Sequence, residues 1–266
     1  MIHSTAVIDA RAQIDPSAEI GPYVVIDGPV VVGPGTSVHP HAVLLGDTTV
    51  GAGNVIHSGA VIGDVPQDLA FARTESAVRI GDRNVIREHV TIHRGTKAGS
   101  VTEIGDDNFF MNNAHVGHNC RIGNHAIIVS GALLAGYVEV ADRVFVSGNC
   151  VVHQFVHIGR LALLRGLSRT SRDVPPFCIM DGTHTVRAIN RVGLRRAGFG
   201  SEQIRDLHRA FVRLFRRRSN LRLACDEIAA QAPSAEVAEL IDFIRGSRRG
   251  VCFGPRVSSA EPAEIE

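Results

Sequence analysis

The chain of 266 residues has no tryptophan, and aromatic residues make up only 5% of it. A globular core of this size usually contains more rings, because aromatic side chains fill much of such cores. Glycine is abundant instead, at 27 residues, and valine and isoleucine are frequent. This composition favours many short strands joined by tight turns. The length allows one large domain or two modest ones.

The sequence also lacks a charge excess and a long apolar run. Lys plus Arg number 28 and Asp plus Glu number 27, so no basic excess indicates nucleic acid as a partner. No run of 18 apolar residues occurs, and the segment MIHSTAVIDARAQID has no signal-peptide pattern. We therefore expect a cytoplasmic protein without stable membrane insertion.

Cysteine is scarce and unpatterned. The five cysteines form no CxxC, and their number is odd, which argues against a disulfide framework and against a zinc-ribbon site. Each is expected to be a small buried apolar residue.

A repeat of six residues dominates the first two thirds of the chain. Aliphatic residues, or Phe110, occupy every sixth position from Ile2 to Leu164 except Asp68, Thr74 and Ala98. A period of six fits neither an α-helix nor a plain strand. It fits a triangular coil of 18 residues, with one strand and one turn on each side and the aliphatic residue inside. The sequence thus predicts a parallel β-helix, a mainly β fold.

A glycine often follows the inward residue, as at Gly33, Gly51 and Gly105. We expect these glycines to supply the backbone freedom that tight corners need.

The interruptions of the repeat predict two loops, at 63–79 and 94–103. Both insert whole multiples of six residues, so the repeat resumes in phase. Loops on a rigid scaffold often carry function. The β-helix is expected to span 1–183, with 171–182 as a proline-containing linker.

A helical C-terminal domain is predicted for 184–253, followed by a disordered tail at 254–266. Ser201 is expected to cap a helix with an apolar stripe from Ile204 to Phe215. Further helices are expected at Leu221–Ala230 and Ala235–Arg245, the last one with Gly246 as its C-cap.

The 18-residue coil brings His118, Gly136 and Gln154 into one column, with His153 in the next. A neutral imidazole can take a proton from a hydroxyl as a general base, and a glycine amide can stabilise an oxyanion. No serine or cysteine occupies this column, so direct acyl transfer is the simpler interpretation. A structural role for the same residues remains an alternative.

A metal site is a further alternative. His115 and His118 lie three residues apart, and with His93 or His153 they could ligate zinc between subunits.

Several segments closely resemble the acyl-[acyl-carrier-protein]–UDP-N-acetylglucosamine O-acyltransferase family. They are QDL at 67–69, GDRNVIREHVTIHRGT at 81–96, NNAHVGHNC at 112–120, VHQFVHIG at 152–159, DVPPF at 173–177 and GLRRAGF at 193–199. The resemblance covers essentially the whole chain. It implies a homotrimer of left-handed β-helices with clefts between subunits.

The resemblance also implies a reaction. The family moves a 3-hydroxyacyl chain from acyl carrier protein to the sugar 3-hydroxyl of UDP-N-acetylglucosamine, the first step of lipid A synthesis, without a cofactor beyond the carrier-protein thioester. It implies that His118 is the general base and that the Gly136 amide is the oxyanion donor. The substrate-binding positions that it implies are Gln67, Asp68, His115, Tyr137, His153, Gln154, Asn190, Arg196 and, as the limit on acyl length, Gly166.

The chain departs from the family pattern on the acceptor side. Ala70 stands where Lys is usual, Tyr137 where His is usual, Asn119 where Asp is usual, Val192 where Glu is common, and Ala197 replaces an Arg. Loss of a Lys and an Arg removes charge-assisted contacts to a diphosphate. The alternatives are therefore a paralogue that acylates another nucleotide sugar, or a metal-dependent protein of the γ-carbonic anhydrase type.

Overall fold

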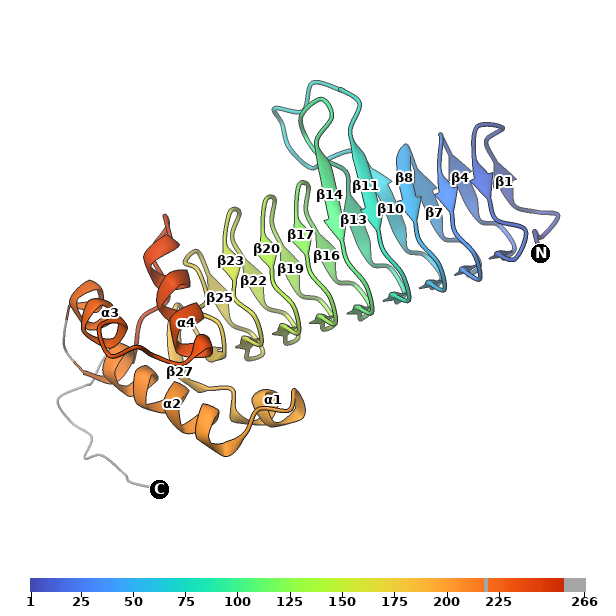
Figure 1. Ribbon diagram of the computed structural model, residues 1–266. Helices are drawn as coiled ribbons and strands as arrows, with labels where there is room; N and C mark the ends of the chain where they lie inside the picture. Colours follow the sequence, from blue (N-terminus) through green and yellow to red (C-terminus); the bar gives the residue numbers. More distant parts are fainter. Residues whose placement is uncertain (218–219, 256–266) are drawn as a thin grey trace.

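The computed structural model describes residues 1–217 and 220–255. Its larger part is a left-handed parallel β-helix, a three-sided prism along which each coil lies on the previous one (Figure 1). Strands in successive coils pair in parallel at the predicted spacing, as Val116, Leu134 and Val152 do. The predicted fold class is confirmed.

Within the described residues the strands form three sheets. The first sheet contains β1 (Val7–Ile8), β4 (Val25–Asp27), β7 (Val43–Leu45), β10 (Val61–Asp64), β13 (Thr91–His93), β16 (His115–Val116), β19 (Leu133–Leu134), β22 (Val151–Val152) and β25 (Arg169–Thr170). The second sheet contains β2 (Gln13–Ile14), β5 (Val31–Val32), β8 (Asp47–Val50), β11 (Ala77–Ile80), β14 (Val101–Ile104), β17 (Arg121–Ile122), β20 (Glu139–Val140) and β23 (His157–Ile158). The third sheet contains β3 (Glu19–Ile20), β6 (Ser37–Val38), β9 (Val55–Ile56), β12 (Val85–Ile86), β15 (Phe109–Phe110), β18 (Ile127–Ile128), β21 (Phe145–Val146), β24 (Leu163–Leu164), β26 (Cys178–Asp181) and β27 (Thr185–Ile189).

The core is a set of stacked aliphatic side chains inside the prism. Ile62, Ile92, Val116 and Leu134, one from each of four successive coils, are fully buried. Burial of one such side chain stabilises the fold by roughly 1.5–3 kcal/mol. Because every coil contributes three of them, the repeat both drives folding and fixes the register of the strands.

The glycines after the inward residues have a different role from the predicted one. Gly33, Gly51 and Gly105 do not have a positive φ, and the left-handed residue of each turn lies two positions later. A Cβ at Gly33 would lie 2.6 Å from the Gly51 carbonyl oxygen, and one at Gly105 would lie 2.7 Å from the Gly123 carbonyl oxygen. These glycines are therefore required by the close stacking of coils rather than by the turn. Gly63, with φ +85°, is an exception.

Both loops leave the prism at the same corner. Residues 65–76 join β10 to β11, and residues 94–100 join β13 to β14, so each loop leads from the first sheet to the second. Figure 1 shows the two loops projecting side by side from the prism. The turns that lead from the first sheet to the second are called the first–second corner below.

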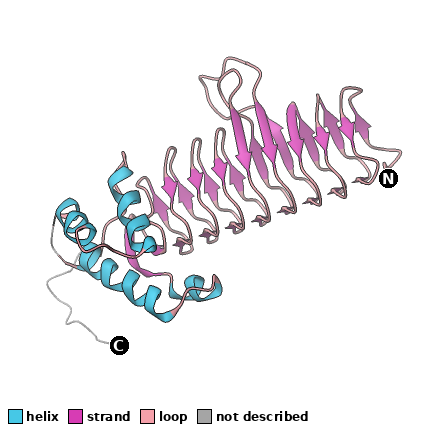
Figure 2. Ribbon diagram, in the orientation of Figure 1, coloured by secondary structure: helices cyan, strands magenta, loops and turns pink. Residues whose placement is uncertain are grey.

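The helices gather at the C-terminal end of the prism (Figure 2). They are α1 (Arg191–Arg196), α2 (Ser201–Phe211), α3 (Leu221–Ala229) and α4 (Ala235–Gly246), with a π-helical turn, η1 (Val212–Arg216), that continues α2. The N-cap of α2 is Gly200 and the C-cap of α4 is Ser247, each one residue from the predicted cap. The predicted stripe from Ile204 to Phe215 packs into the core, continuous across η1.

Two elements at this end were not predicted from the sequence. The segment 171–182, expected as a linker, contains β26, which pairs in parallel with β24 and places Met180 beside Leu164, 16 residues earlier rather than 18. Its prolines, Pro175 and Pro176, precede the strand and so leave its pairing intact. β27 then turns back antiparallel to β26. Most of the predicted tail, residues 256–266, lies outside the described residues.

None of the helices in the described part of the chain is both long and apolar enough to cross a membrane.

Candidate active site

The predicted column of His118, Gly136 and Gln154 lies at the first–second corner. Each of the three residues follows a strand of the first sheet, β16, β19 or β22, and precedes a strand of the second. A Cβ on Gly136 would lie 2.3 Å from the His118 ring atoms Cε1 and Nε2, so the imidazole packs directly on the glycine one coil away. The 18-residue arithmetic therefore places these residues correctly in space.

The Gly136 amide is available for a ligand. No backbone or side-chain acceptor within residues 1–217 and 220–255 takes its hydrogen. Because the His118 ring covers the same glycine, an oxyanion bound to this amide would lie beside the imidazole.

The first loop brings a carboxylate close to His118. Asp68 Oδ2 lies 4.0 Å from His118 Nε2, and the Asp68 side chain is one third exposed. Its other oxygen accepts from the Ala70 amide at 2.9 Å, which closes a tight turn and orients the carboxyl group. Gln67, predicted beside it, is exposed on the same loop. The distance between Asp68 and His118 leaves room for a substrate hydroxyl, whose one hydrogen can be donated to either of the two acceptors.

The second loop reaches the other nitrogen of the base through Asn119. His118 Nδ1 lies 3.0 Å from Asn119 Oδ1, and the same oxygen accepts from both the amide and the hydroxyl of Thr96, each at 3.0 Å. Asn119 has φ +60°, a left-handed conformation that asparagine tolerates better than most residues. The backbone of this turn is held in addition by the buried Thr102, whose hydroxyl accepts from the Asn119 amide at 2.8 Å.

His115 lies in β16, three residues before the base, and is kept uncharged. Burial, with smaller contributions from His93 and His118, lowers the pKa of His115 to about 4. Its Nδ1 is 2.7 Å from Thr91 Oγ1. Burial lowers the pKa of the neighbouring His93 as well, and the Nδ1 of His93 donates to the Val65 carbonyl at 2.6 Å. The wall beside the base is thus polar and neutral near pH 7.

An aromatic stack closes the column on its other side. The Tyr137 ring meets the His118 ring edge-on, with centroids 5.2 Å apart, and stacks on Phe155 at 4.7 Å. Both rings line a groove of about 580 Å³ that continues over the second sheet between Glu103, Arg121, Glu139 and His157. Phe155 stays 45% exposed, so this aromatic surface is open to a ligand or to another chain.

Other predicted residues lie further from the base. His153 and Gln154 are exposed in the turn after β22. Gly166 follows β24 of the third sheet and precedes β25 of the first, so it lies at a different corner of the prism from His118. One chain alone does not bring Gly166 to the base.

The two residues predicted at the nucleotide end lie beside α1. Asn190 is its N-cap: it accepts from the Gly193 amide at 3.0 Å and donates to the Leu161 carbonyl at 2.9 Å, and it is only 6% exposed. Arg196 is exposed in the last turn of the same helix. The roles of Asn190 and Arg196 in nucleotide binding stay predictions. The Asn190 side chain also has a structural role as the N-cap of α1.

The cysteines of the chain are buried, and the one nearest His118 in sequence is Cys120. Burial raises the pKa of the Cys120 thiol, two residues from the base, to about 12, so this thiol stays protonated at neutral pH. All five cysteines are free and buried. Across residues 1–217 and 220–255, no group of three or more His, Cys, Asp or Glu side chains could hold a metal ion.

Thr96 and Thr102 at this site were missed by the sequence reasoning. Thr96 stands in the quoted segment that ends in HRGT, but a loop outside the repeat has no predictable register. Thr102 lies two residues before the inward Ile104 and is itself buried in β14, a position that the repeat of six does not mark.

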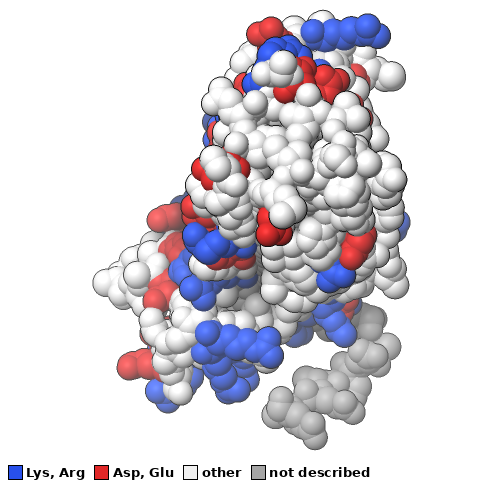
Figure 3. All heavy atoms as spheres, turned by 90° about the vertical axis from the view of Figure 1, so that its right-hand side faces the viewer, with Lys and Arg blue, Asp and Glu red and all other residues white. Residues whose placement is uncertain are grey.

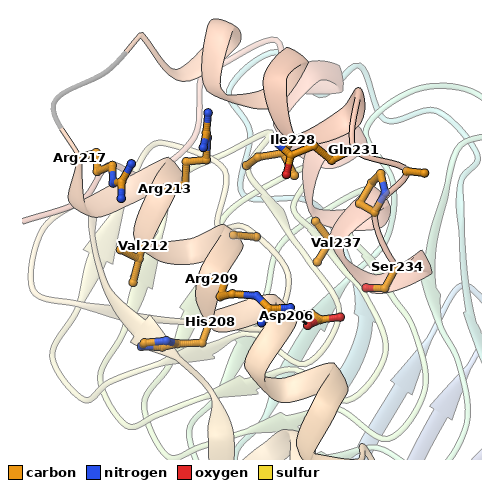
Figure 4. Close-up of a pocket in the computed structure, with 13 residues that line it drawn as sticks. Asp206, His208, Arg209, Val212, Arg213, Arg217, Ile228, Gln231, Ser234 and Val237 are labelled. Carbon is orange, nitrogen blue, oxygen red and sulfur yellow. Dashed lines mark hydrogen bonds and ion pairs between the residues drawn. The ribbon is translucent and has the colours of Figure 1, made fainter.

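A separate hollow lies within the helical part. A cavity of about 550 Å³ opens between α2 with η1 on one side and the loop from α3 to α4 on the other, and Figure 4 shows Arg209, Arg213 and Arg217 along one wall. Arg209 pairs with Asp206 at 2.5 Å and Arg213 pairs with Glu227. This cavity belongs to the helices and contains no residue of the His118 column.

Fold and site together define a hexapeptide-repeat acyltransferase. The bacterial transferase hexapeptide family model matches residues 29–64 and 102–136, and the model described as UDP N-acetylglucosamine O-acyltransferase, domain 2, matches residues 173–252. An acyl-[acyl-carrier-protein]–UDP-N-acetylglucosamine O-acyltransferase from Anaeromyxobacter dehalogenans is 46% identical over 253 residues, which cover 94% of this chain and 98% of the relative. The chain belongs to the acyl-[acyl-carrier-protein]–UDP-N-acetylglucosamine O-acyltransferase family, and it is an enzyme.

Solved structures agree with this assignment. The UDP-N-acetylglucosamine acyltransferase of Francisella novicida superposes with a TM-score of 0.92 at 36% identity and covers 96% of this chain and 95% of its own. The corresponding enzyme of Bacteroides fragilis has a TM-score of 0.91 at 39% identity, with coverage of 94% and 99%.

Proposed function

We propose that this chain transfers a 3-hydroxyacyl group from acyl carrier protein to the 3-hydroxyl of UDP-N-acetylglucosamine. The observation that carries the proposal is the packing of the His118 ring on Gly136, whose amide has no acceptor in the described part of the chain, with Asp68 4.0 Å from Nε2. A base, an oxyanion donor and a group that can hold a hydroxyl thus meet at one point, which is what acyl transfer to an alcohol requires.

The reaction follows from these positions. The sugar hydroxyl lies between Asp68 and His118 and gives its proton to Nε2 as its oxygen attacks the thioester carbonyl. The Gly136 amide donates to the oxyanion of the tetrahedral intermediate. The intermediate expels the carrier thiolate, which takes the proton back from the imidazolium. The new ester bond and the free thiol balance the step, and no covalent acyl-enzyme is needed.

We propose that the active enzyme is a homotrimer. His118 and Gly166 lie at different corners of one chain, so a site that contains both needs two subunits. Apolar side chains are also exposed beside these corners: Leu133 and Val151, paired on the first sheet, are 43% and 48% exposed, and Leu167 is 78% exposed. Light scattering of the purified protein is expected to give three times the chain mass.

The charge distribution supports a carrier-protein partner. Residues 184–253 contain 14 arginines and seven acidic residues, a net charge of +7, whereas residues 1–183 contain 13 basic and 17 acidic residues, a net charge of −4. Figure 3 shows basic side chains gathered toward the bottom of the view, where the helical part lies.

A docking position follows from the free arginines of this part. Arg191, Arg195 and Arg205 line a hollow of about 410 Å³ between α1 and α2, and none of the three pairs with an acid in the described chain. We call these three residues the arginine surface and propose that the carrier protein docks there through acidic side chains of its own.

The nucleotide-sugar acceptor distinguishes the proposed enzyme from a paralogue that acylates another nucleotide sugar. Ala70 and Ala197 remove two cationic side chains from the positions that the family uses for the diphosphate, which favours a test of several nucleotide sugars. Purified protein is given 3-hydroxyacyl carrier-protein thioesters of several lengths with each sugar, and products are identified by mass spectrometry.

The expected product of that assay is 3-O-acylated UDP-N-acetylglucosamine. Turnover of a different nucleotide sugar alone would identify a paralogue. No thiol release with any acceptor, together with activity that requires zinc, would replace acyl transfer with the metal-dependent alternative.

A further inference from the structure

The hydrogen bonds around Asn119 determine which of its side-chain atoms faces the base. The Thr96 backbone N–H can only donate, and it lies 3.0 Å from the atom assigned as Asn119 Oδ1. If the amide were flipped, two N–H groups would face each other. The atom is therefore the oxygen, and every group that contacts it must donate.

The protonation of His118 follows from that assignment. Its Nδ1 lies 3.0 Å from the same oxygen, so Nδ1 carries the hydrogen. In a neutral imidazole the other nitrogen, Nε2, then has the free electron pair. Nε2 is the atom that faces Asp68 and the Gly136 coil. The base is thus held in the tautomer that can accept a proton from the substrate side.

Thr96 and Tyr137 continue this hydrogen-bond network. The Thr96 hydroxyl donates to Asn119 Oδ1 at 3.0 Å, so its oxygen has lone pairs left to accept the Tyr137 hydroxyl, also at 3.0 Å. The chain of donors runs from Tyr137 through Thr96 to Asn119, where His118 also donates. The Tyr137 ring in addition supports the imidazole edge-on and is itself stacked on Phe155.

We propose that Thr96 and Tyr137 are positioning residues that act through Asn119 to keep Nδ1 of His118 protonated and its Nε2 free. An aspartate beside the base, which the family pattern has, would fix the tautomer by its charge alone. Asparagine carries no charge and can rotate by half a turn to present its NH₂ group, so here the second loop must fix its orientation. This inference rests on the proposed role of His118 as general base.

The kinetic test uses variants that remove one hydroxyl each. Thr96→Val removes the hydroxyl donor but keeps the backbone N–H, so Asn119 Oδ1 retains one of its two donors from the second loop. We expect kcat to fall about tenfold, while KM for either substrate changes less than twofold, because the loss concerns the transition state. Thr96→Ser keeps the hydroxyl and should restore kcat. Tyr137→Phe should have a smaller effect, because Thr96 can still donate to Asn119.

The controls are matched in chemistry and position. Tyr23 has the same left-handed turn conformation, φ +59°, and stacks on His41 far from the site, so Tyr23→Phe should leave kcat unchanged. Thr185→Val removes a hydroxyl that donates to the Thr183 carbonyl at 3.0 Å, and it should also leave kcat unchanged.

A second readout is the pH profile. Asn119→Asp keeps an acceptor at Nδ1 and adds a negative charge that stabilises the imidazolium. We therefore expect Asn119→Asp to remain active and the acid limb of its kcat/KM profile to lie at higher pH than that of the unmodified enzyme. Added to Asn119→Asp, the change Thr96→Val should lower kcat less than it does in the unmodified enzyme. The reason is that a carboxylate presents an oxygen to Nδ1 in either orientation.

The tautomer itself can be observed without any activity. In protein labelled with ¹⁵N-histidine and studied above pH 8, the His118 resonance, assigned by its loss in His118→Gln, should show hydrogen on Nδ1. In Thr96→Val the Nε2–H form should appear beside it. Hydrogen on Nε2 in the unmodified trimer, or an unchanged tautomer and kcat in Thr96→Val, would overturn the inference. Absence of acyl transfer with every substrate would instead refute the proposed function.

Discussion

At the scale of the residue, His118 has a different neighbour in each direction. Gly136 lies beneath its ring, Asn119 binds Nδ1, Asp68 faces Nε2, and Tyr137 meets its edge. The side chain is only 12% exposed, so the surroundings rather than bulk water set its orientation. In the proposed mechanism each neighbour affects a different part of the reaction, so single substitutions can separate their roles.

The first prediction concerns the base. His118→Ala should reduce kcat by roughly 10²–10⁴-fold, the usual contribution of a general base, while substrate affinity changes much less. His115→Ala should be milder and affect mainly KM. His39→Ala, at another corner, is the control that should leave turnover unchanged. Near-normal turnover by a folded His118→Ala protein would remove the mechanism.

The second prediction concerns stability at acid pH. The pKa of His115 is about 4 in the folded protein, against 6.5 for an ordinary histidine, so between these values the unfolded chain binds a proton that the folded chain does not. Stability should therefore be fully present above pH 6.5 and fall as the pH is lowered to about 4, by up to about 3 kcal/mol.

Denaturant unfolding at pH 7 and pH 5 measures this loss. In His115→Gln the difference between the two pH values should be smaller, whatever the absolute stability of the variant. An equal difference in both proteins would show that His115 is not the group responsible.

At the scale of the element, the turn glycines of the coils differ in what lies over them. A Cβ at Gly136 would meet the His118 ring at 2.3 Å, whereas one at Gly148, in the turn after β21, would meet its nearest neighbour, the Ser130 carbonyl oxygen, at 3.4 Å. Neither glycine has a positive φ, so space alone separates them.

The third prediction uses this pair. Gly136→Ala should displace the base and lower kcat/KM by about 10²-fold, since a misplacement near 1 Å has an effect of that size. Gly148→Ala should leave kcat/KM unchanged. An equal loss of kcat/KM in both variants would contradict the prediction. It would show that a methyl group at any such glycine disturbs the stacking of the coils.

The fourth prediction concerns acyl length. A Cβ at Gly166 would have only the Gly148 carbonyl oxygen, at 3.6 Å, within 4 Å, so the fold accepts a larger side chain there. If this corner faces the acyl chain in the trimer, Gly166→Met should shift the preferred donor to a shorter chain. Arg165 pairs with Asp181 at 3.1 Å, so Arg165→Met serves as the control and should leave the preference unchanged. An unchanged preference in Gly166→Met would show that the acyl chain ends elsewhere.

Sequence reasoning succeeded where the structure repeats. A period in the sequence predicts the inward residues, the column of His118 and Gly136, and the apolar stripe of α2. Such a period can be recognised without knowledge of the tertiary structure. The partners of Asn119 do not, because Thr96 lies in a loop whose path depends on what it packs against. The prediction that the glycines after the inward residues are structurally required is correct, but the predicted reason is wrong. Close stacking of coils and tight turns both select glycine, so the sequence alone does not distinguish them.

At the scale of the whole molecule, charge is divided between the two parts. The helical part is strongly basic and the prism is weakly acidic, although the chain is nearly neutral overall. A partner that is acidic would therefore be attracted to one end of the molecule only.

The fifth prediction tests the arginine surface. Arg195→Glu with Arg205→Glu should raise KM for the carrier-linked donor about tenfold or more, and added salt should reduce the difference from the unmodified enzyme. The same variant should use a short pantetheine thioester as well as the unmodified enzyme does. Arg143→Glu, an exposed arginine on the prism, is the control. An unchanged KM in the double variant would place the carrier elsewhere.

If the carrier docks on the arginine surface, the stacking of whole coils sets the distance that its acyl arm must span. Gly136 and Gln154 mark the two coils that follow that of His118, and β25 and β26 add part of a third coil before the chain enters the helical end. Each coil adds about 4.8 Å along the prism. The separation between the base and the arginine surface can therefore change only in steps of one coil, by gain or loss of 18 residues in phase. An arm of fixed length on the carrier suits only certain coil numbers, so relatives that use the same arm should keep this count even where their loops differ in length.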